Sequence, residues 1–162
     1  MKLPVEEKAR LEQLCHQFRI DLIEVLHQRQ TGHPGGSLSL CEIMTTLYFK
    51  EMNVDPANPK MADRDRLVLC KGHAAPILYR VLAEKGFFPV EEMKTLRCFE
   101  TRLQGHPCPL ETPGVDAATG PLGIGLSAAL GMSMAQRWTS PPPAFTPSWV
   151  TARSTRAPCG RL

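Results

Sequence analysis

The sequence predicts an α/β domain, in which helices flank a parallel sheet. Three observations lead to this prediction: a long amphipathic helical pattern near the start, a short apolar run over 66–70, and a glycine-rich loop over 120–125 that leads into a further helical pattern. Helices that alternate with a short buried strand are typical of this fold class. Ligands of such folds bind beyond the carboxyl ends of the strands, so the loops there are the first candidates for a site.

Length and charge restrict the classes of protein to be considered. The chain has 162 residues, 43% of them hydrophobic, which suffices for one domain with a real core. Its formal net charge of +3 disappears when the three arginines among the last ten residues are left out, so we predict no nucleic-acid surface. There is no long apolar run and no hydrophobic signal segment, which predicts no membrane span and a cytoplasmic location.

The six cysteines are scattered and form no Cys-x-x-Cys pair. We interpret them as buried apolar side chains or incidental thiols. His106-Pro-Cys108 could be half of a metal site, but a second pair of ligands at suitable spacing is missing. The sequence therefore predicts no zinc site.

The first half of the chain begins with helices. Apolar residues at intervals of three and four predict a helix over 5–29, with Gly32 as its C-terminal cap. The stretch 33–37 is expected to be a loop that carries one imidazole at its tip. Ser39-Leu-Cys-Glu42 has the pattern of a capping box, which predicts a helix over 39–50.

The second half carries the predicted strand and its loop. Arg66-Leu-Val-Leu-Cys70 is typical of a buried parallel strand that opens into Lys71-Gly72-His73. A helix over 74–85 is expected to end at Gly86. Another is expected to begin around Pro89 and to carry Met93, Leu96 and Phe99.

The glycine loop is the first candidate for a binding element. Gly120, Gly123 and Gly125 allow the backbone to approach a ligand, and Pro121 stiffens the turn between them. The helix predicted over 126–137 begins with unpaired N–H groups, which suit an anion or the polar edge of a cofactor.

Three of the five histidines directly follow a glycine, namely His33, His73 and His106. The glycine allows each loop to bend so that the ring points into a cleft, where a neutral imidazole can move protons. The alternative is that each ring only satisfies a local backbone group. His16 and His27 lie within the first helical pattern.

An ordered series of motifs over about residues 8–137 resembles the N-terminal, diphosphate-binding part of transketolase, and most of all its split-subunit form. The motifs are Thr31-Gly-His33-Pro-Gly-Gly-Ser-Leu-Ser, Asn58-Pro59, Asp63-Arg-Asp65-Arg66-Leu-Val-Leu, Lys71-Gly-His73-Ala-Ala-Pro-Ile-Leu-Tyr79, Gly86-Phe-Phe, Leu103-Gln-Gly-His106-Pro and Pro113-Gly-Val-Asp-Ala-Ala-Thr-Gly-Pro-Leu-Gly-Ile-Gly. Deoxyxylulose-phosphate synthase is a poorer match, because its first motif normally lacks the His-Pro-Gly-Gly found here.

The resemblance implies a thiamine-diphosphate-binding fold and a two-carbon ketol transfer between sugar phosphates, as in the pentose phosphate pathway. The cofactor and its Mg²⁺ would lie between this domain and a pyrimidine-binding domain or subunit, in a homo- or hetero-oligomer. Gly120, Pro121 and Leu122 match the loop that touches the middle of the cofactor. His73 matches a histidine near the diphosphate and the substrate, His33 one that moves protons at the acceptor oxygen, and His106 one that binds hydroxyls of the donor sugar.

Two parts of the sequence depart from this pattern. Ile124 replaces a common glutamine, and Cys108 stands where an acidic residue is usual. After Arg137 the family has a Gly-Asp-Gly motif and a later asparagine that bind magnesium, and the chain has neither. We therefore expect no metal ligand here, a domain fragment over 1–137 that is inactive alone, and a non-native, disordered tail over 138–162.

The composition of this tail has an explanation in the genetic code. The genetic code allows a set of codons for residues 149–162 that, when it is read from one base earlier, encodes Leu-Gly-Asp-Gly-Glu-Val-Asp-Glu-Gly-X-Val-Trp-Glu-Ala. This second peptide resembles the magnesium motif of transketolase. We therefore hypothesise a frameshift between about Gln136 and Trp149. Two other functions remain open: a non-catalytic module of this fold that associates with a transketolase partner, and an unrelated small α/β binding protein.

Overall fold

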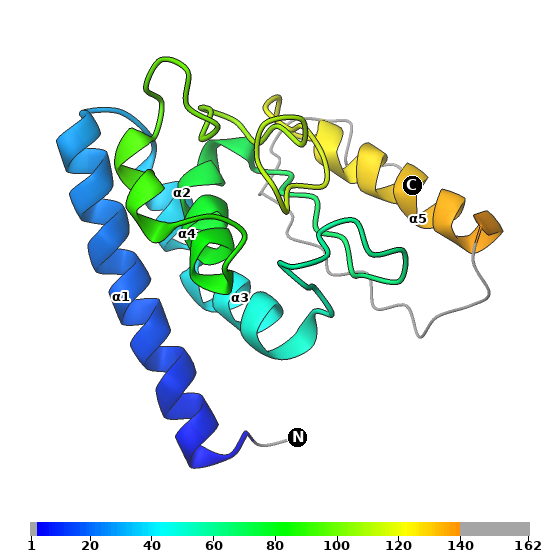
Figure 1. Ribbon diagram of the computed structural model, residues 1–162, viewed down its shortest axis with the longest axis horizontal. Coiled ribbons are helices and arrows are strands. Elements are labelled where there is room, and N and C mark those ends of the chain that lie inside the picture. Colours follow the sequence, from blue (N-terminus) through cyan, green and yellow to red (C-terminus); the bar gives the residue numbers. More distant parts are fainter. Residues whose placement is uncertain (1–2, 140–162) are drawn as a thin grey trace.

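The structure is a computed structural model that describes residues 3–139, with side chains up to residue 135. Its elements are helical: α1 Val5–Arg29, α2 Pro34–Leu38, α3 Cys41–Thr46, a π-helical turn η1 Leu47–Glu51, a 3₁₀ turn η2 Gly72–Ala74, α4 Ala75–Lys85, a 3₁₀ turn η3 Val90–Thr95, and α5 Ile124–Thr139. Helices α1 to α4 lie together, and α5 lies on the opposite side of the molecule from α1 (Figure 1). Most of the tail expected over 138–162 lies outside the described residues.

Helix α1 confirms the predicted helix over 5–29, but its cap is not Gly32. Gln30 takes the left-handed conformation, with φ of 49°, and its N–H donates to the carbonyl of His27 at 3.3 Å. Gly32 is also left-handed, with φ of 114°, and a Cβ there would collide with Leu26. Gly32 therefore serves the turn that follows the helix.

The stretch 33–37, expected as a loop, is mostly helical because Pro34 occupies the first position of α2 with its φ already suited to a helix. The predicted capping box at Ser39 is wrong, since α3 begins at Cys41 and no side chain caps it. The Ser39 hydroxyl instead donates to the carbonyl of Gly36 at 3.0 Å, at the end of α2. A serine has several backbone groups within reach, and here it bonds to the preceding turn.

Helix α4 lies in the middle of the core. Every residue from Ala75 to Ala83 is buried, as expected of a helix that has neighbours on all sides. Those neighbours include α1, α2, α3 and η3. Arg80 is the charged side chain in this stretch, and its guanidinium pairs with Asp21 at 2.6 Å and Glu84 at 2.8 Å. Pairing of this kind is what makes a buried charge tolerable.

Residues 67–70 are buried as predicted, whereas Arg66 is exposed, and the segment is not a strand. The described residues contain no strand, and Leu69 makes only an isolated bridge. A strand requires backbone hydrogen bonds to a neighbouring strand, and the prediction from sequence assumed such a neighbour. The Leu67 N–H instead donates to the Asp116 carboxylate at 2.8 Å, and Asp116 also pairs with Arg64.

The helix expected from Pro89 is the 3₁₀ turn η3. Met93 and Leu96 are buried, but Phe99 is 91% exposed and lies beyond the end of η3, so the prediction that the helix carries Phe99 is wrong. The reason is that η3 ends at Thr95: Leu96 leaves the helical conformation with ψ of 123°, and Arg97 is left-handed with φ of 57°.

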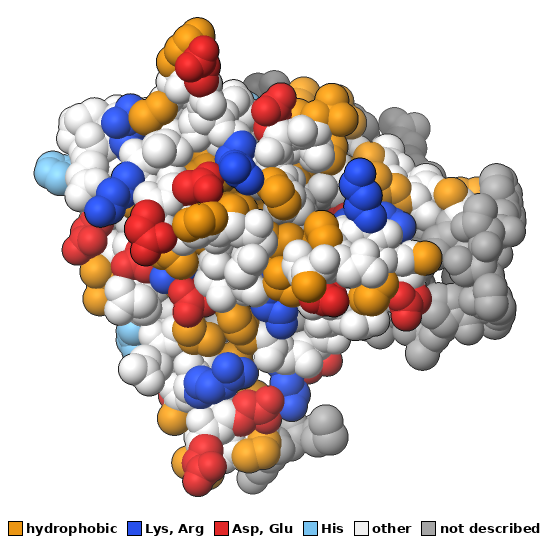
Figure 2. Space-filling model, viewed as in Figure 1, with side chains coloured by type: hydrophobic (Ala, Val, Ile, Leu, Met, Phe, Trp, Pro, Cys, Tyr) orange, Lys and Arg blue, Asp and Glu red, His pale blue; other side chains and the backbone are white. Residues whose placement is uncertain are grey.

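Helix α5 packs on the segment 66–70. Leu126, Ala129 and Met132 lie against a small cluster made by Val68, Cys70 and Ala117. None of the helices in the described part is long and apolar enough to cross a bilayer. Acidic and basic side chains are interspersed on the face of the molecule shown in Figure 2.

The glycine loop is held against η2. A Cβ built on Gly72 would lie 2.7 Å from the carbonyl oxygen of Thr119 and 3.0 Å from the Cα of Gly120. Both contacts are to backbone, which cannot rotate away as a side chain can. Gly72 therefore allows two segments that are distant in sequence to touch.

Replacement of Asp116 by asparagine should destabilise the fold by about 3–5 kcal/mol, because it leaves the buried Arg64 guanidinium without its counter-charge. Burial raises the pKa of Asp116, and the Leu67 amide and Arg64 oppose that rise. Chemical denaturation measures the loss, with the exposed Asp63→Asn as control. A loss at Asp116 below about 1 kcal/mol, typical of a surface pair, would contradict the structural role.

Replacement of Gly72 by alanine should lower the free energy of unfolding by about 1–3 kcal/mol, because the methyl group has no room against the Thr119 backbone. Gly35→Ala is the matched control, since nothing lies within 4 Å of a Cβ there. Equal melting temperatures for the two variants would show that the contact between Gly72 and the loop is loose.

Candidate functional site

His33, His73 and His106 form a row of imidazole rings. The centroids of His33 and His73 are 4.9 Å apart with the ring planes at 83°, and those of His73 and His106 are 4.9 Å apart at 88°. His33 and His106 are exposed, while His73 is half-buried between them. The three histidines that follow glycines thus come together from three separate segments, whereas His16 and His27 are exposed on α1.

Each ring is placed by the local structure of its segment. His33 stands immediately before Pro34, at the N-terminus of α2, and His73 lies in the turn η2. His106 is positioned from the core, because the hydroxyl of Tyr79 on α4 donates to the carbonyls of Gln104 at 2.9 Å and His106 at 3.1 Å. Burial raises the pKa of Tyr79, so its hydroxyl keeps the proton that makes these bonds.

The glycine loop runs beside one end of the histidine row. A Cβ built on Gly120 would lie 3.6 Å from the ring of His106, an ordinary contact distance. Pro121 and Leu122 are exposed. Thr119 lies directly before them, and its hydroxyl is buried with no hydrogen-bond partner among the described residues. A buried polar atom of this kind is available to a ligand.

The charges around the row are positive or titratable. Partial burial lowers the pKa of His106, and the neighbouring His73, Arg97 and His33 lower it further. Burial also lowers the pKa of Lys71, whose ammonium group donates to the Ser39 hydroxyl at 3.0 Å. The lowered pKa of His106 favours a neutral ring, which can accept or donate a proton near neutral pH.

Sequence reasoning missed three side chains of this region: Lys71, Tyr79 and Arg97. Lys71 and Tyr79 stand within one of the motifs that resemble transketolase, so their position in that motif could have identified them as candidates. Arg97 gave no such signal, because its guanidinium contacts Thr31 and Gly105, and only the fold brings these segments together.

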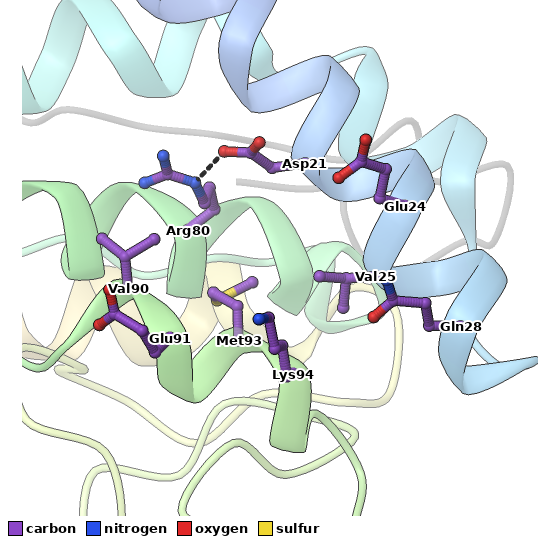
Figure 3. A pocket seen from close by; sticks show the side chains of 9 residues that line it. All are labelled: Asp21, Glu24, Val25, Gln28, Arg80, Val90, Glu91, Met93 and Lys94. Atoms are coloured by element: carbon purple, nitrogen blue, oxygen red, sulfur yellow. Dashed lines mark hydrogen bonds and ion pairs between the residues drawn. The ribbon is translucent and has the colours of Figure 1, made fainter.

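No group of three His, Cys, Asp or Glu in the described part lies close enough to hold a metal ion. Two pockets of the described part lie away from the histidine row. One of about 220 Å³ lies between α1 and η3, with Arg80 of α4 at its side (Figure 3). Its arginine is already paired with Asp21, as the dashed line shows. Another, of about 320 Å³, lies along α1 near Cys15 and Glu42.

Comparison with known proteins identifies the family. The family described as transketolase, thiamine diphosphate binding domain, matches residues 11–142. A 6-deoxy-6-sulfo-D-fructose transketolase subunit of Clostridium sp. strain MSTE9 is 45% identical over 130 residues, which are 80% of this chain and 47% of that protein. One of the subunits of the apulose-4-phosphate transketolase of Phocaeicola vulgatus is 43% identical over 127 residues, 78% of this chain and 45% of the relative.

Human transketolase is 42% identical over 131 residues, 80% of this chain and 21% of the human protein. The chain thus spans about half the length of the relatives that are subunits and about a fifth of the longer ones.

Solved structures of transketolases are similar to this chain as well. Transketolase from Campylobacter jejuni superposes with a TM-score of 0.73 at 32% identity, over 83% of this chain and 20% of that one. The Leishmania mexicana enzyme gives 0.73 at 30% identity, over 77% and 19%. The chain therefore has the thiamine-diphosphate-binding fold of these enzymes, and it belongs to the family of transketolase thiamine diphosphate-binding domains.

Proposed function

We propose that the chain is the N-terminal, diphosphate-binding part of a transketolase, an enzyme that transfers a two-carbon ketol unit between sugar phosphates in the pentose phosphate pathway. The observation that carries the proposal is the row of His33, His73 and His106 beside the Gly120 loop. The relatives are named transketolases, which favours this interpretation over a deoxyxylulose-phosphate-synthase-like relative.

The residues fit the middle of thiamine diphosphate. The loop over 120–122 offers backbone without a bulky side chain at Gly120, and the buried Thr119 hydroxyl beside it lacks a partner within the described part. When bound, thiamine diphosphate supplies the thiazolium carbon that serves as nucleophile and electron sink. His73 and the loop would contact the cofactor, His106 would bind sugar hydroxyls, and His33 would hold or move a proton at the acceptor oxygen.

The residues do not fit the Mg²⁺ ion that accompanies the diphosphate in this family. The described part offers no cluster of ligands for a metal, and two phosphate groups need a counter-charge to stay in place. The proposal therefore includes inactivity of this chain alone. It also includes the boundary near residue 137 and the frameshift in the codons beyond about Gln136, which would have displaced the magnesium motif.

A partner completes the proposed site. Large apolar side chains are exposed in the segments that carry the histidines and the glycine loop: Phe99 and Leu110 at 91%, Leu122 at 50% and Ile124 at 61%. Exposed apolar groups around a polar site support coverage by another chain. The partner proposed is a pyrimidine-binding transketolase domain or subunit, in a homo- or hetero-oligomer, because two relatives are themselves named subunits.

A cytoplasmic location belongs to the same proposal. It is supported by Cys15, Cys41, Cys98 and Cys108, which are thiols in the structure, as in most proteins of reducing compartments. The second candidate function is a non-catalytic module that keeps this fold to associate with a transketolase partner. The absence of a metal-ligand cluster from the described part favours this candidate, and the histidine row favours a catalytic origin.

In a chain whose reading frame is restored beyond about Gln136, replacement of Gly120 by alanine should weaken the binding of thiamine diphosphate with Mg²⁺ in calorimetry while leaving the melting temperature unchanged. The new methyl group would make only an ordinary contact with His106, at 3.6 Å, but it would stand where the cofactor approaches the loop. Gly35→Ala is the control, because its surroundings are open. Equal affinity of the frame-restored chain with and without Gly120→Ala would contradict the placement of the cofactor.

Activity separates the two candidate functions. We expect no turnover of ketose and aldose phosphates by this chain alone. Turnover by the chain alone would disprove the proposed inactivity. Binding to a pyrimidine-binding subunit without turnover would favour the non-catalytic module.

The coding DNA tests the frameshift directly. Read from one base earlier, the codons for 149–162 should encode Gly-Asp-Gly within an apolar and acidic context. Codons that do not encode this motif in the neighbouring frame would end the hypothesis. Restoration of the frame should then confer magnesium-dependent binding of thiamine diphosphate, measured by the same calorimetry.

A further inference from the structure

Arg97 connects the two Gly-His-Pro segments of the chain. Its Nη1 donates to the hydroxyl of Thr31 at 2.9 Å, and its Nη2 donates to the carbonyl of Gly105 at 3.3 Å. Thr31 stands two residues before His33, and Gly105 stands immediately before His106. One guanidinium group therefore holds the segments on both sides of the histidine row.

The local structure is built closely around this side chain. A Cβ on Gly105 would lie 3.2 Å from Nε of Arg97 and 3.4 Å from its Cζ, so a larger residue would push the guanidinium away. The backbone N–H of Arg97 donates to the carbonyl of Leu103 at 3.0 Å. These contacts hold the arginine in place against its unfavourable left-handed backbone, with φ of 57°. Strained conformations of this kind persist only when the surroundings enforce them, and they cluster at functional sites.

The charge of Arg97 is not used in an ion pair, since no carboxylate within residues 3–135 pairs with it. Both hydrogen bonds of its side chain go to neutral oxygens, one on each segment. The planar fork of an arginine suits such a bridge, because it directs two donors at fixed angles. A lysine presents a single ammonium group and cannot reproduce this geometry.

We infer that Arg97 is a positioning residue that fixes His33 and His106 on either side of His73. The ring of His73 lies 4.9 Å from each of the other two, so a shift of either segment would break one of these contacts. The inference rests on the proposed function for what the histidines do, but the positioning itself needs no cofactor and can be measured without one.

Imidazole NMR signals of the full chain, assigned to individual histidines, test this role. Arg97→Gln should shift the signals of both His33 and His106 and raise the pKa of His106, because the positive charge of Arg97 is one cause of its lowering. Arg102→Gln is the matched control, since it removes one charge from an exposed arginine of the same segment that pairs only with Glu92 in the described part. It should move neither signal.

Two further variants separate positioning from charge and from folding. Thr31→Val removes one hydrogen bond without a change of charge, and it should shift the signal of His33 while leaving that of His106 in place. Arg97→Lys keeps the charge and should still shift both signals. Wild-type signals in Arg97→Lys, or unchanged signals in Arg97→Gln, would overturn the inference.

If Arg97→Gln does not melt cooperatively, its signals cannot be compared with those of the folded wild type. Thr31→Val and Arg97→Lys then test the positioning role of Arg97. An unshifted His33 in Thr31→Val then counts against positioning. Failure of a chain with the restored reading frame to bind thiamine diphosphate with Mg²⁺ would contradict the proposed function and leave the NMR result standing.

Discussion

The burial of α4 on every side is the constraint on which the rest of the structure depends. A helix without a solvent-facing stripe needs neighbours all around it, and α1, α2, α3 and η3 provide them. The two polar residues of its buried stretch, Tyr79 and Arg80, have separate tasks. Arg80 pairs with carboxylates inside the core, while Tyr79 reaches the segment of His106 through its hydroxyl. The same buried helix thus holds the fold together and places one end of the histidine row.

The site itself consists of loops and short turns that this core supports, a common arrangement for functional groups. Glycine makes the close approaches possible: Gly72 touches the backbone of Thr119, and Gly120 lies beside the ring of His106. Burial and neighbouring positive groups lower the pKa of His106, and burial lowers that of Lys71. The physical result is a group of nitrogen atoms ready to exchange protons or to meet an anion, and this suits a polar, anionic cofactor.

What the described part lacks is as informative for the proposal as what it contains. It offers no cluster of metal ligands, and the apolar side chains of Phe99, Leu110, Leu122 and Ile124 are exposed. Relatives that are themselves subunits, of which the chain spans about half, support a site that a second chain completes. The proposed frameshift accounts for both the missing magnesium motif and the composition of residues 138–162.

The sequence by itself determined what depends on neighbours along the chain: helix α1 over 5–29, the left-handed cap at Gly86, and the series of motifs that indicates the family. Local patterns failed where a polar group had competing partners, as at Ser39, or where pairing is non-local, as in the segment 66–70. Only the tertiary structure decided that Arg97 bridges Thr31 and Gly105, because hydrogen bonds between distant segments leave no periodic trace in a sequence.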